Sequence, residues 1–386
     1  MTLRVGKLVY GMIRLLPCLL AVLLASSCSS DVNSDEQKGD KTLVTLTIAA
    51  SGNAATASRA ISGNSSTITR GGVSDSNDKD YYISDLTVLI FDESGNVIGS
   101  TTKQASDLSI ADGKITIQVL TRAAQNCTVY AIANALALNG DKTPFAGIAT
   151  LSALKSKVKT YTNADDINTE TCLLMMGKTA DNSFDTTNSG SAAAISLQRL
   201  ASKITFNIKA EANDIKGISY PVVIDSYQLC NVPNATFYTH DDMANPTLPA
   251  DNTYQNFSEQ KTPVNSWDSN PIVSYVQYVY ANPATAETNA TYLLIKAHAQ
   301  ASSANTAKIW ESVFKVYLKE VKQGGALMTQ YQILPNYHYT VNITIKGSKV
   351  TTDNGVQCTA YPFFSTGSLQ KWTPDTTDID FKYEGN

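Results

Sequence analysis

The stretch TLVTLTIAA at residues 42–50 places Val44, Leu46 and Ile48 at every second position, with threonines between them. Because the side chains of a strand point alternately to its two faces, this stretch predicts a strand with one buried apolar face. The same period of two returns at 115–119, 204–209 and 339–345. Helical spacing of apolar residues occurs mainly at 149–161. The chain is therefore predicted to be all-β, with a short helix or two in its connections.

Strand patterns follow one another twice in the same order. Those at 42–50, 83–91 and 127–135 are matched further along by 203–210, 222–230 and 291–298. A chain of 386 residues is also too long for one ordinary core. We therefore predict two β-sandwich domains, an N-terminal one over residues 41–195 and a C-terminal one over 196–386.

The first thirty residues have the composition of an export signal. Basic residues precede a short apolar run at 15–24, which ends in Ala25-Ser26-Ser27-Cys28. The run is too short to span a bilayer. Small residues before a cysteine resemble the lipobox of bacterial lipoproteins, which predicts a signal peptide over 1–27 and acylation of Cys28. An ordinary signal peptide cut near Ser27 is the alternative. Residues 28–40 are polar and acidic and predict a flexible tether.

Residues 51–80 form a long stretch of Ser, Gly, Asn, Thr, Ala and Asp with few apolar residues. Loops of this length inside a domain are uncommon and are often functional or open to proteolysis. Before Lys79, its basic residues are Arg59 and Arg70. Both are predicted to be accessible to a trypsin-like protease, and an inert loop is the alternative.

Composition and motifs give no indication of catalysis. The net charge is −4, 17% of residues are charged, and no basic cluster is present, which argues against nucleic acid as a partner. The three histidines, His240, His298 and His338, have no metal-ligand spacing, and no nucleophile or phosphate-binding motif occurs. We predict no catalytic residue, metal site or cofactor, and hence a protein that is not an enzyme.

Four cysteines remain once the signal segment and Cys28 are set aside, namely Cys127, Cys172, Cys230 and Cys358. An exported protein can form disulfides, and four cysteines allow three pairings. Cys127 and Cys230 lie in strand patterns, so buried free thiols are the other interpretation.

Four further stretches carry a family resemblance: ISDLTVLIFD at 83–92, VYAIANA at 129–135, LQRLASKI at 197–204 and LPNYHYTV at 334–341. Together with the lipoprotein start, they resemble the type V pilins, or fimbrillins, of Bacteroidales. The resemblance implies two tandem transthyretin-like, Greek-key β-sandwich domains. It also implies an outer-membrane lipoprotein precursor held in the lipid by acylated (palmitoylated) Cys28. An arginine-specific protease is then expected to cut after Arg70, with Arg59 as the second candidate.

The resemblance further implies that this cut releases the first strand and opens a groove, which a strand from the C-terminal region of the next subunit fills. The candidate for that strand lies in the C-terminal extension, residues 349–386. There Ile379, Phe381 and Tyr383 alternate with polar residues, with the same period as Val44, Leu46 and Ile48. These three are the predicted donor strand, which would replace the displaced first strand of a neighbouring subunit. A last strand of the chain's own domain is the alternative, and the resemblance favours donation.

The sequence thus predicts a structural subunit of a cell-surface fimbrium. It would polymerise by donor-strand exchange with copies of itself or related pilins, and would serve adhesion to a host or bacterial receptor. The alternative is a non-polymerising surface lipoprotein or a tip adhesin that binds glycan or protein. Whether the subunit belongs to stalk, tip or anchor stays open.

Overall fold

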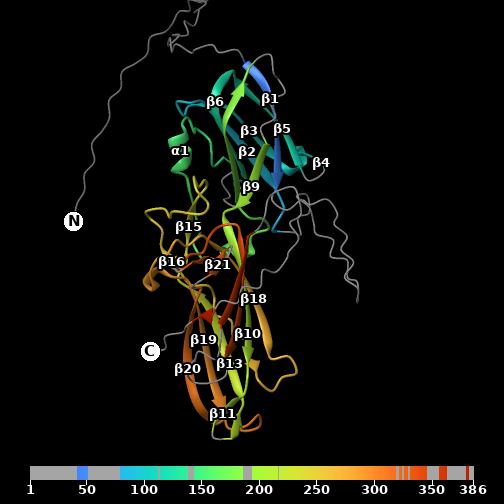
Figure 1. The fold of residues 1–386 in the computed structure, drawn as a ribbon. Coiled ribbons are helices and arrows are strands. Elements are labelled where there is room, and N and C mark those ends of the chain that lie inside the picture. Colours follow the sequence, from blue (N-terminus) through green and yellow to red (C-terminus); the bar gives the residue numbers. More distant parts are fainter. Residues whose placement is uncertain are drawn as a thin grey trace, which may run out of the picture. The chain divides into compact units, whose positions relative to one another are not determined.

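The computed structural model describes residues 41–50, 79–111, 114–137, 143–185, 194–215, 217–318, 321–323, 326–328, 331–345, 356–362 and 380–381. These residues lie in one compact unit, Gly39–Asn386. Their regular structure is strand, apart from the short helices α1 (Leu151–Lys155) and α2 (Asp166–Thr169) and the 3-10 turns η1 (Ala105–Asp107) and η2 (Glu287–Asn289) (Figure 1). The predicted all-β class is confirmed. No helix in the described part of the chain is long and apolar enough to span a membrane.

The first half of the chain forms one eight-stranded sheet. Its strands are β1 (Lys41–Ala50), β2 (Asp85–Phe91), β3 (Val97–Gln104), β4 (Ser109–Ala111), β5 (Lys114–Arg122), β6 (Ala124–Ala133), β8 (Met175–Phe184) and β9 (Ala194–Arg199). The order is β1-β9-β8-β6-β2-β3-β5-β4, and β1 also pairs with β5. This additional pairing joins the sheet back on itself, so β1 has a hydrogen-bonded neighbour on each side (Figure 1).

Two glycines allow the sheet to turn its corners beside β1. At Gly177 of β8, a Cβ atom would lie 2.5 Å from the backbone oxygen of Ser196 in β9. At Gly99 of β3, it would lie 2.7 Å from Cβ of Thr121 in β5. Only a residue without a side chain permits so close an approach. These glycines let β9 and β5, the two neighbours of β1, approach β8 and β3 closely.

We expect Gly177→Ala to destabilise the protein by about 2–3 kcal/mol, because the added methyl group must displace backbone rather than a side chain. Ser183→Ala, at an exposed position of the same strand, is the matched control and should change stability by less than about 0.5 kcal/mol. Urea unfolding of both variants measures the difference. Equal midpoints for the two would show that β9 does not depend on the glycine.

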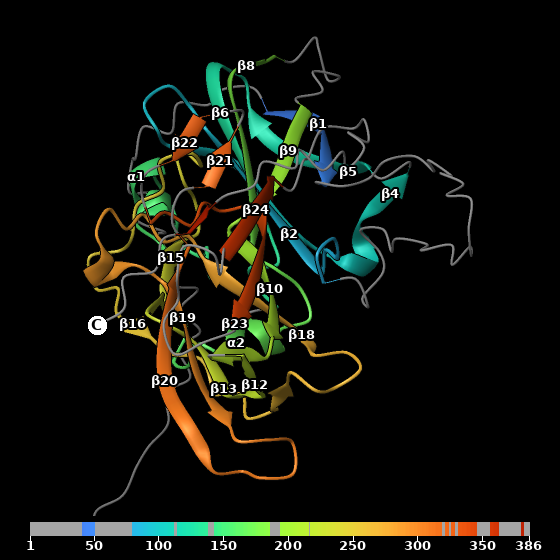
Figure 2. The same cartoon turned by 60° about the horizontal axis from the view of Figure 1, so that its bottom comes forward.

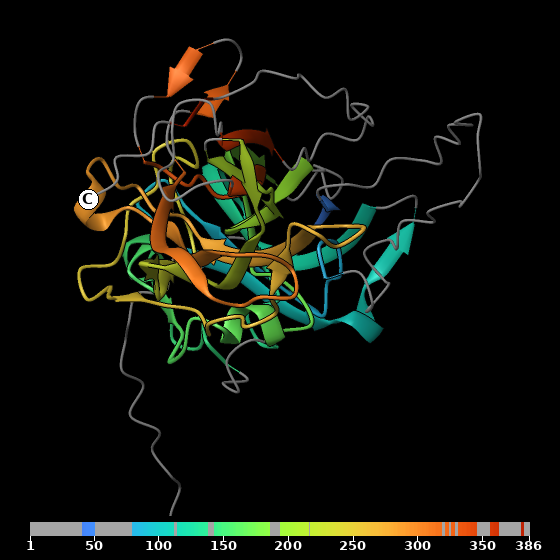
Figure 3. The ribbon, with the colours of Figure 1, turned by 90° about the horizontal axis from the view of Figure 1, so that it is seen from below.

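The second half of the chain forms two main sheets. One has the order β18 (Ile272–Tyr280), β10 (Ala201–Ala210), β23 (Tyr337–Ile345), β24 (Val356–Pro362) and β25 (Asp380–Phe381). The other has the order β17 (Val264–Asn265), β13 (Val222–Cys230), β19 (Tyr292–Gln300) and β20 (Lys308–Tyr317). Side chains of both sheets, among them Phe206 of β10 and Ile295 of β19, share one core cluster, as in a sandwich. Figures 2 and 3 show the ribbon of these strands from two further directions.

Four two-stranded ribbons complete the described strands. They are β7 (Val158–Thr160) with β15 (Ala235–Phe237), β11 (Asn213–Ile215) with β12 (Ile218–Tyr220), β14 (Val232–Pro233) with β16 (Tyr254–Gln255), and β21 (Val321–Gln323) with β22 (Ala326–Met328). The first of these corrects the expectation of a helix over 149–161. Thr150 caps α1 through Ala153 N, 3.2 Å from its Oγ1, but the helix ends at Lys155. Residues 158–160 are strand because they pair with β15, a partner distant in sequence.

The pairing pattern repeats between the halves. In the first sheet, β1 is antiparallel to β5 and parallel to β9. In the second half, β10 is antiparallel to β18 and parallel to β23. The strand that follows also corresponds, because β2 and β13 each lie between two antiparallel neighbours. The change from the first sheet to the next takes place at Leu200, between β9 and β10.

Candidate functional site around the first strand

The predicted first strand is present as β1, and its apolar face is fully buried. Val44 is 1% exposed, and Leu46 and Ile48 are not exposed at all. All three belong to the core cluster of the first sheet, together with residues of β5 and β9 such as Ile117 and Ile195. Each fully buried aliphatic side chain stabilises the fold by roughly 1.5–3 kcal/mol. The strand therefore contributes to the centre of this core.

Backbone pairing holds β1 along its whole length. Its register with β5 runs from Lys41 opposite Arg122 to Ala49 opposite Lys114, and the pair is antiparallel. Its register with β9 runs from Thr47 opposite Ala194 to Ala50 opposite Leu197, and this pair is parallel. Removing β1 would expose hydrogen-bonding edges on two strands and an apolar groove between them. Any strand that fills the groove must meet one antiparallel and one parallel neighbour.

After β1, the next residues that the structure describes begin at Lys79. We call residues 79–82 the anchor segment. The Lys79 ammonium donates to the backbone oxygen of Ile167 and lies 4.7 Å from the centre of the Tyr278 ring. Burial lowers the pKa of Lys79 to about 8, against the opposing effect of Glu170 and Asp80. The ammonium is thus partly removed from water and is held by the Ile167 oxygen and the Tyr278 ring.

Asp80 is the most strongly bonded residue of the anchor segment. Its carboxylate accepts from Lys203 Nζ at 2.9 Å and from the Tyr278 hydroxyl at 2.6 Å. Its backbone oxygen accepts from Nε of Arg199, a side chain with no exposed surface. Although burial opposes ionisation, Lys203 and the other donors keep the pKa of Asp80 below its ordinary value. The segment that follows the predicted cleavage region is thus fixed to β10 and β18.

Several predicted site residues lie outside the described residues. These are Cys28, Arg59, Arg70, Ile379 and Tyr383. Phe381 lies in β25, where its backbone is opposite Val356 of β24 in an antiparallel pair that spans two residues. Lipidation, cleavage and strand donation therefore stay predictions.

The histidines are separated from one another in the fold. His298 in β19 contacts Asp225 (Nδ1 to Oδ2, 2.9 Å), and His338 in β23 contacts Thr205 (Nε2 to Oγ1, 2.9 Å). His240 lies in the loop after β15 with Nε2 3.1 Å from the Thr236 hydroxyl. Among the described residues, no group of three or more His, Cys, Asp or Glu side chains is arranged to hold a metal ion.

Acid should destabilise the protein through His240, which is 5% exposed. Burial lowers the pKa of His240 from 6.5 to about 4. The pKa of His240 is lower in the folded protein than in the unfolded one, so protonation favours the unfolded state. The free energy of unfolding is therefore unaffected by His240 above pH 6.5 and decreases as the pH falls toward 4. We expect this loss to reach about 2–3 kcal/mol near pH 4. Urea unfolding of wild type and His240→Gln from pH 7 to 4 measures it. The variant should lose less stability over this range, and parallel curves would contradict the prediction.

Cys127, Cys172 and Cys230 are buried free thiols. Burial raises the pKa of Cys127 and of Cys172 to about 11, and also raises that of Cys230. Such thiols are poor nucleophiles at neutral pH. The interpretation as buried free thiols is confirmed for these three, while the side chain of Cys358, in β24, lies outside the described residues.

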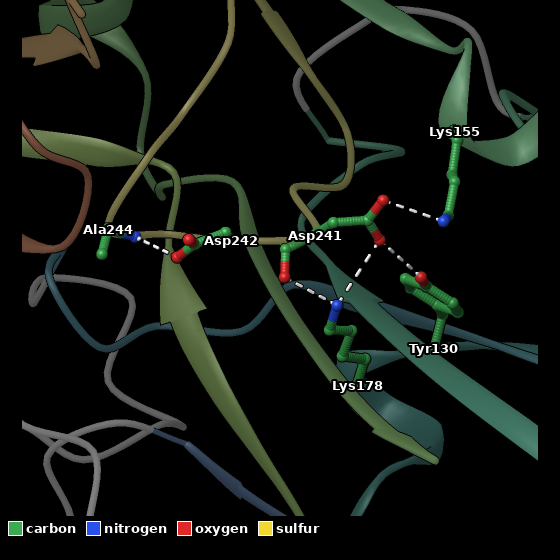
Figure 4. A network of polar contacts seen from close by, with 6 residues as sticks. All are labelled: Tyr130, Lys155, Lys178, Asp241, Asp242 and Ala244. Atoms are coloured by element: carbon green, nitrogen blue, oxygen red, sulfur yellow. Dashed lines mark hydrogen bonds and ion pairs between the residues drawn. The ribbon is translucent and has the colours of Figure 1, made fainter.

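A network that the sequence did not reveal surrounds Asp241, in the same loop as His240 (Figure 4). Its carboxylate is 2.8 Å from Lys155 Nζ at the end of α1 and 3.4 Å from both Lys178 Nζ of β8 and the Tyr130 hydroxyl of β6. Lys178 also donates to the backbone oxygen of Asp241 at 2.7 Å. The hydrogen bond from Lys155 is the main cause of the lowered pKa of Asp241. Because these ion pairs are largely exposed, each contributes only about 0–1 kcal/mol.

Comparison with known proteins supplies the family. The family model described as major fimbrial subunit protein (FimA) matches residues 44–222, from the centre of β1 to the start of β13. Residues 44–222 belong to the FimA major fimbrial subunit family. The resemblance to the fimbrillins is therefore confirmed. The family supports a pilus or adhesion subunit on a cell-surface appendage. No curated protein sequence matches the chain.

Solved structures agree with this family at the level of the fold. A candidate cell adhesion protein of Parabacteroides distasonis ATCC 8503 is 17% identical, with a TM-score of 0.57, covering 86% of this chain and 98% of that one. A second from the same organism is 14% identical, with a TM-score of 0.56 and coverage of 84% and 98%. The fimbrilin (FimA) of Porphyromonas gingivalis W83 is 14% identical, with a TM-score of 0.51 and coverage of 83% and 97%. Fimbrillins and cell adhesion proteins thus share this strand-rich fold.

Proposed function

We propose that this fimbrillin-family chain is a polymerising pilus subunit built from two transthyretin-like domains. It is exported as a lipoprotein through Cys28 and reaches the outer membrane. An arginine-specific protease cuts it after Arg70, or alternatively after Arg59, and so releases the first strand with the lipid. The C-terminal segment of a neighbouring subunit then enters the groove by donor-strand exchange.

One observation carries this proposal: β1 is central to the first core but is joined to the rest of the chain only through the segment that contains both arginines. Val44, Leu46 and Ile48 are buried between β5 and β9. The chain returns to the described fold at Lys79, where the anchor segment is fixed independently of β1. A cut between β1 and Lys79 would therefore break the covalent link between β1 and the rest of the fold. The contacts of the anchor segment would remain in place.

The groove also specifies what can replace β1. The incoming strand must present apolar side chains at every second position and pair with β5 and β9 simultaneously. Ile379, Phe381 and Tyr383 have this alternation. Addition of a strand from another chain gives affinity through backbone bonds and selectivity through the alternate side-chain pockets. The period of the C-terminal segment therefore supports its role as donor.

The mature N-terminus of protein sheared from intact cells tests the proposal, by terminal sequencing and intact mass. A start at Gly71 is expected, or at Ala60 if the cut follows Arg59. A start at acylated Cys28 in the polymerised material would contradict it, because β1 would then be retained. That outcome would favour an anchored, non-polymerising lipoprotein.

A further inference from the structure

We propose that the anchor segment, residues 79–82, shields the peptide bond after Lys79 from trypsin-like proteases and so confines cleavage between β1 and β2 to the two arginines. Three basic residues lie between these strands, Arg59, Arg70 and Lys79. The shield concerns proteases that also cut after lysine, because the arginine-specific protease of the proposed function does not act on Lys79. That the shield protects a maturing pilus subunit rests on the proposed function, whereas the shielding itself follows from contacts within one chain.

The contacts of the Lys79 side chain within the fold prevent it from entering the specificity pocket of a trypsin-like protease. Such an enzyme must draw the basic side chain into its own specificity pocket. In this protein the ammonium donates to the Ile167 backbone oxygen in α2 and lies over the Tyr278 ring of β18. Both contacts must break before the side chain can enter a protease.

The residue after the bond is held more firmly still. Asp80 accepts from Lys203, Tyr278 and Arg199, through both carboxylate oxygens and its backbone oxygen. Bonds in which one partner is charged are about twice as strong as neutral ones. Arg199 is itself fixed, because Asn336 Oδ1 lies 3.4 Å from its Nη1 and 3.2 Å from its backbone nitrogen. The backbone around the scissile bond therefore cannot become extended without local opening.

The next two residues are fixed as well. The Tyr81 ring packs against the Arg199 guanidinium, 4.7 Å from its Cζ. The Tyr82 backbone oxygen accepts from Asn134 Nδ2 at 2.9 Å. Asn134 is fully buried and also donates to Leu173 O at 2.6 Å. A protease that needs an extended stretch on both sides of the bond would have to remove the whole segment from its contacts.

Trypsin tests the shield, because it cuts after lysine as well as after arginine. The full chain is digested, and mass spectrometry gives the cleavage rate after Lys79 and after each arginine. A synthetic peptide of residues 73–86 supplies the rate of the unprotected bond and includes any effect of the neighbouring acidic residues. We expect the bond after Lys79 to be cut at least about 100-fold more slowly in the protein than in the peptide, and more slowly than the bonds after the arginines.

Two variants probe the shield without changing the residues beside the bond. Tyr278→Phe removes one hydrogen bond to Asp80 but keeps the ring under Lys79, and Lys203→Met removes the ion pair. Each should accelerate cleavage after Lys79 by about tenfold or more. Lys209→Met is the matched control on the same strand, because its ammonium pairs with Glu211 at the surface. It should leave the rate unchanged.

Four results would overturn the proposal. Two concern the wild type: cleavage after Lys79 at the rate of the peptide, or as fast as after the arginines. The third is that the variants are cut after Lys79 no faster than the wild type. The fourth is an equal acceleration of cleavage after Lys296, in β19, which is paired with a strand on each side and becomes accessible only on global unfolding. Failure of the proposed function is distinct: native fimbriae would then begin upstream of Ala60 while the trypsin result still held.

Discussion

A chain that begins at Gly71, with no strand supplied in place of β1, will fail to form a stable first sheet. It loses the burial of Val44, Leu46 and Ile48, which together contribute about 5–9 kcal/mol. Each lost ladder bond adds about 0.5–1.5 kcal/mol. A typical domain has a free energy of unfolding of only about 5–15 kcal/mol, so little or none remains. Hydrogen exchange and circular dichroism should show loss of protection in β5 and β9.

A peptide of residues 41–50 added in trans is the positive control, and it should restore protection in β5 and β9. If the shortened chain kept the full stability of the intact one without the peptide, β1 would be dispensable and the groove hypothesis would be wrong.

Two leucines of β1 give a matched pair of point variants. Leu46→Ala, at a fully buried position, should cost about 2–5 kcal/mol. Leu43→Ala, where the side chain is 45% exposed, should cost less than about 0.5 kcal/mol.

The strands that the sequence predicted well are those whose burial pattern is local. In β1, β5, β10 and β23 apolar residues recur at every second position, and the structure buries this predicted face of each strand. The denser apolar run of β2 has a different cause. Its seven residues are all buried because Leu86, Val88 and Ile90 face one core cluster, while Leu89 and Phe91 face another. The turn after it has Gly95 at φ +80°, and the Gly95 nitrogen donates to Asp92 O at 2.9 Å.

The residues that the sequence could not place depend on partners far away in the chain. The sequence around Gly177 does not indicate that β9 lies in contact with it. A glycine within a strand pattern is equally compatible with a close approach of another strand and with a bulge. Asp241 lies in a polar stretch that favours a solvated carboxylate, yet the fold brings Lys155, Lys178 and Tyr130 to it. Arg199 lies at the end of a strand pattern, and only the tertiary structure shows its complete burial against Asp80. Long-range pairing therefore limits sequence-based prediction of the polar sites.

Deletion of residues 375–386 should abolish SDS-resistant ladders of the assembled protein while the monomer still folds. The deletion removes Ile379, Phe381 and Tyr383, the apolar positions that we propose to fill the groove of the next subunit. Within its own chain, the described contact of this segment is the two-residue pair of β25 with β24 at the edge of the five-stranded sheet. Its loss should therefore change monomer stability by only about 1 kcal/mol. Gel electrophoresis without boiling, beside urea unfolding of the monomer, measures both effects.

Mixing separates donation from acceptance. A subunit without residues 375–386 still has its groove, so it can accept a strand but cannot donate one. Added to wild-type subunits, it should end chains and shorten the ladders in proportion to its share of the mixture. A subunit with Phe381→Asp should behave in the same way, because a charge would have to enter the buried face of the groove. Lys382→Ala, at the neighbouring position with the opposite orientation, should leave the ladders intact. Ladders of normal length from the deleted subunit alone would assign the segment to its own sheet.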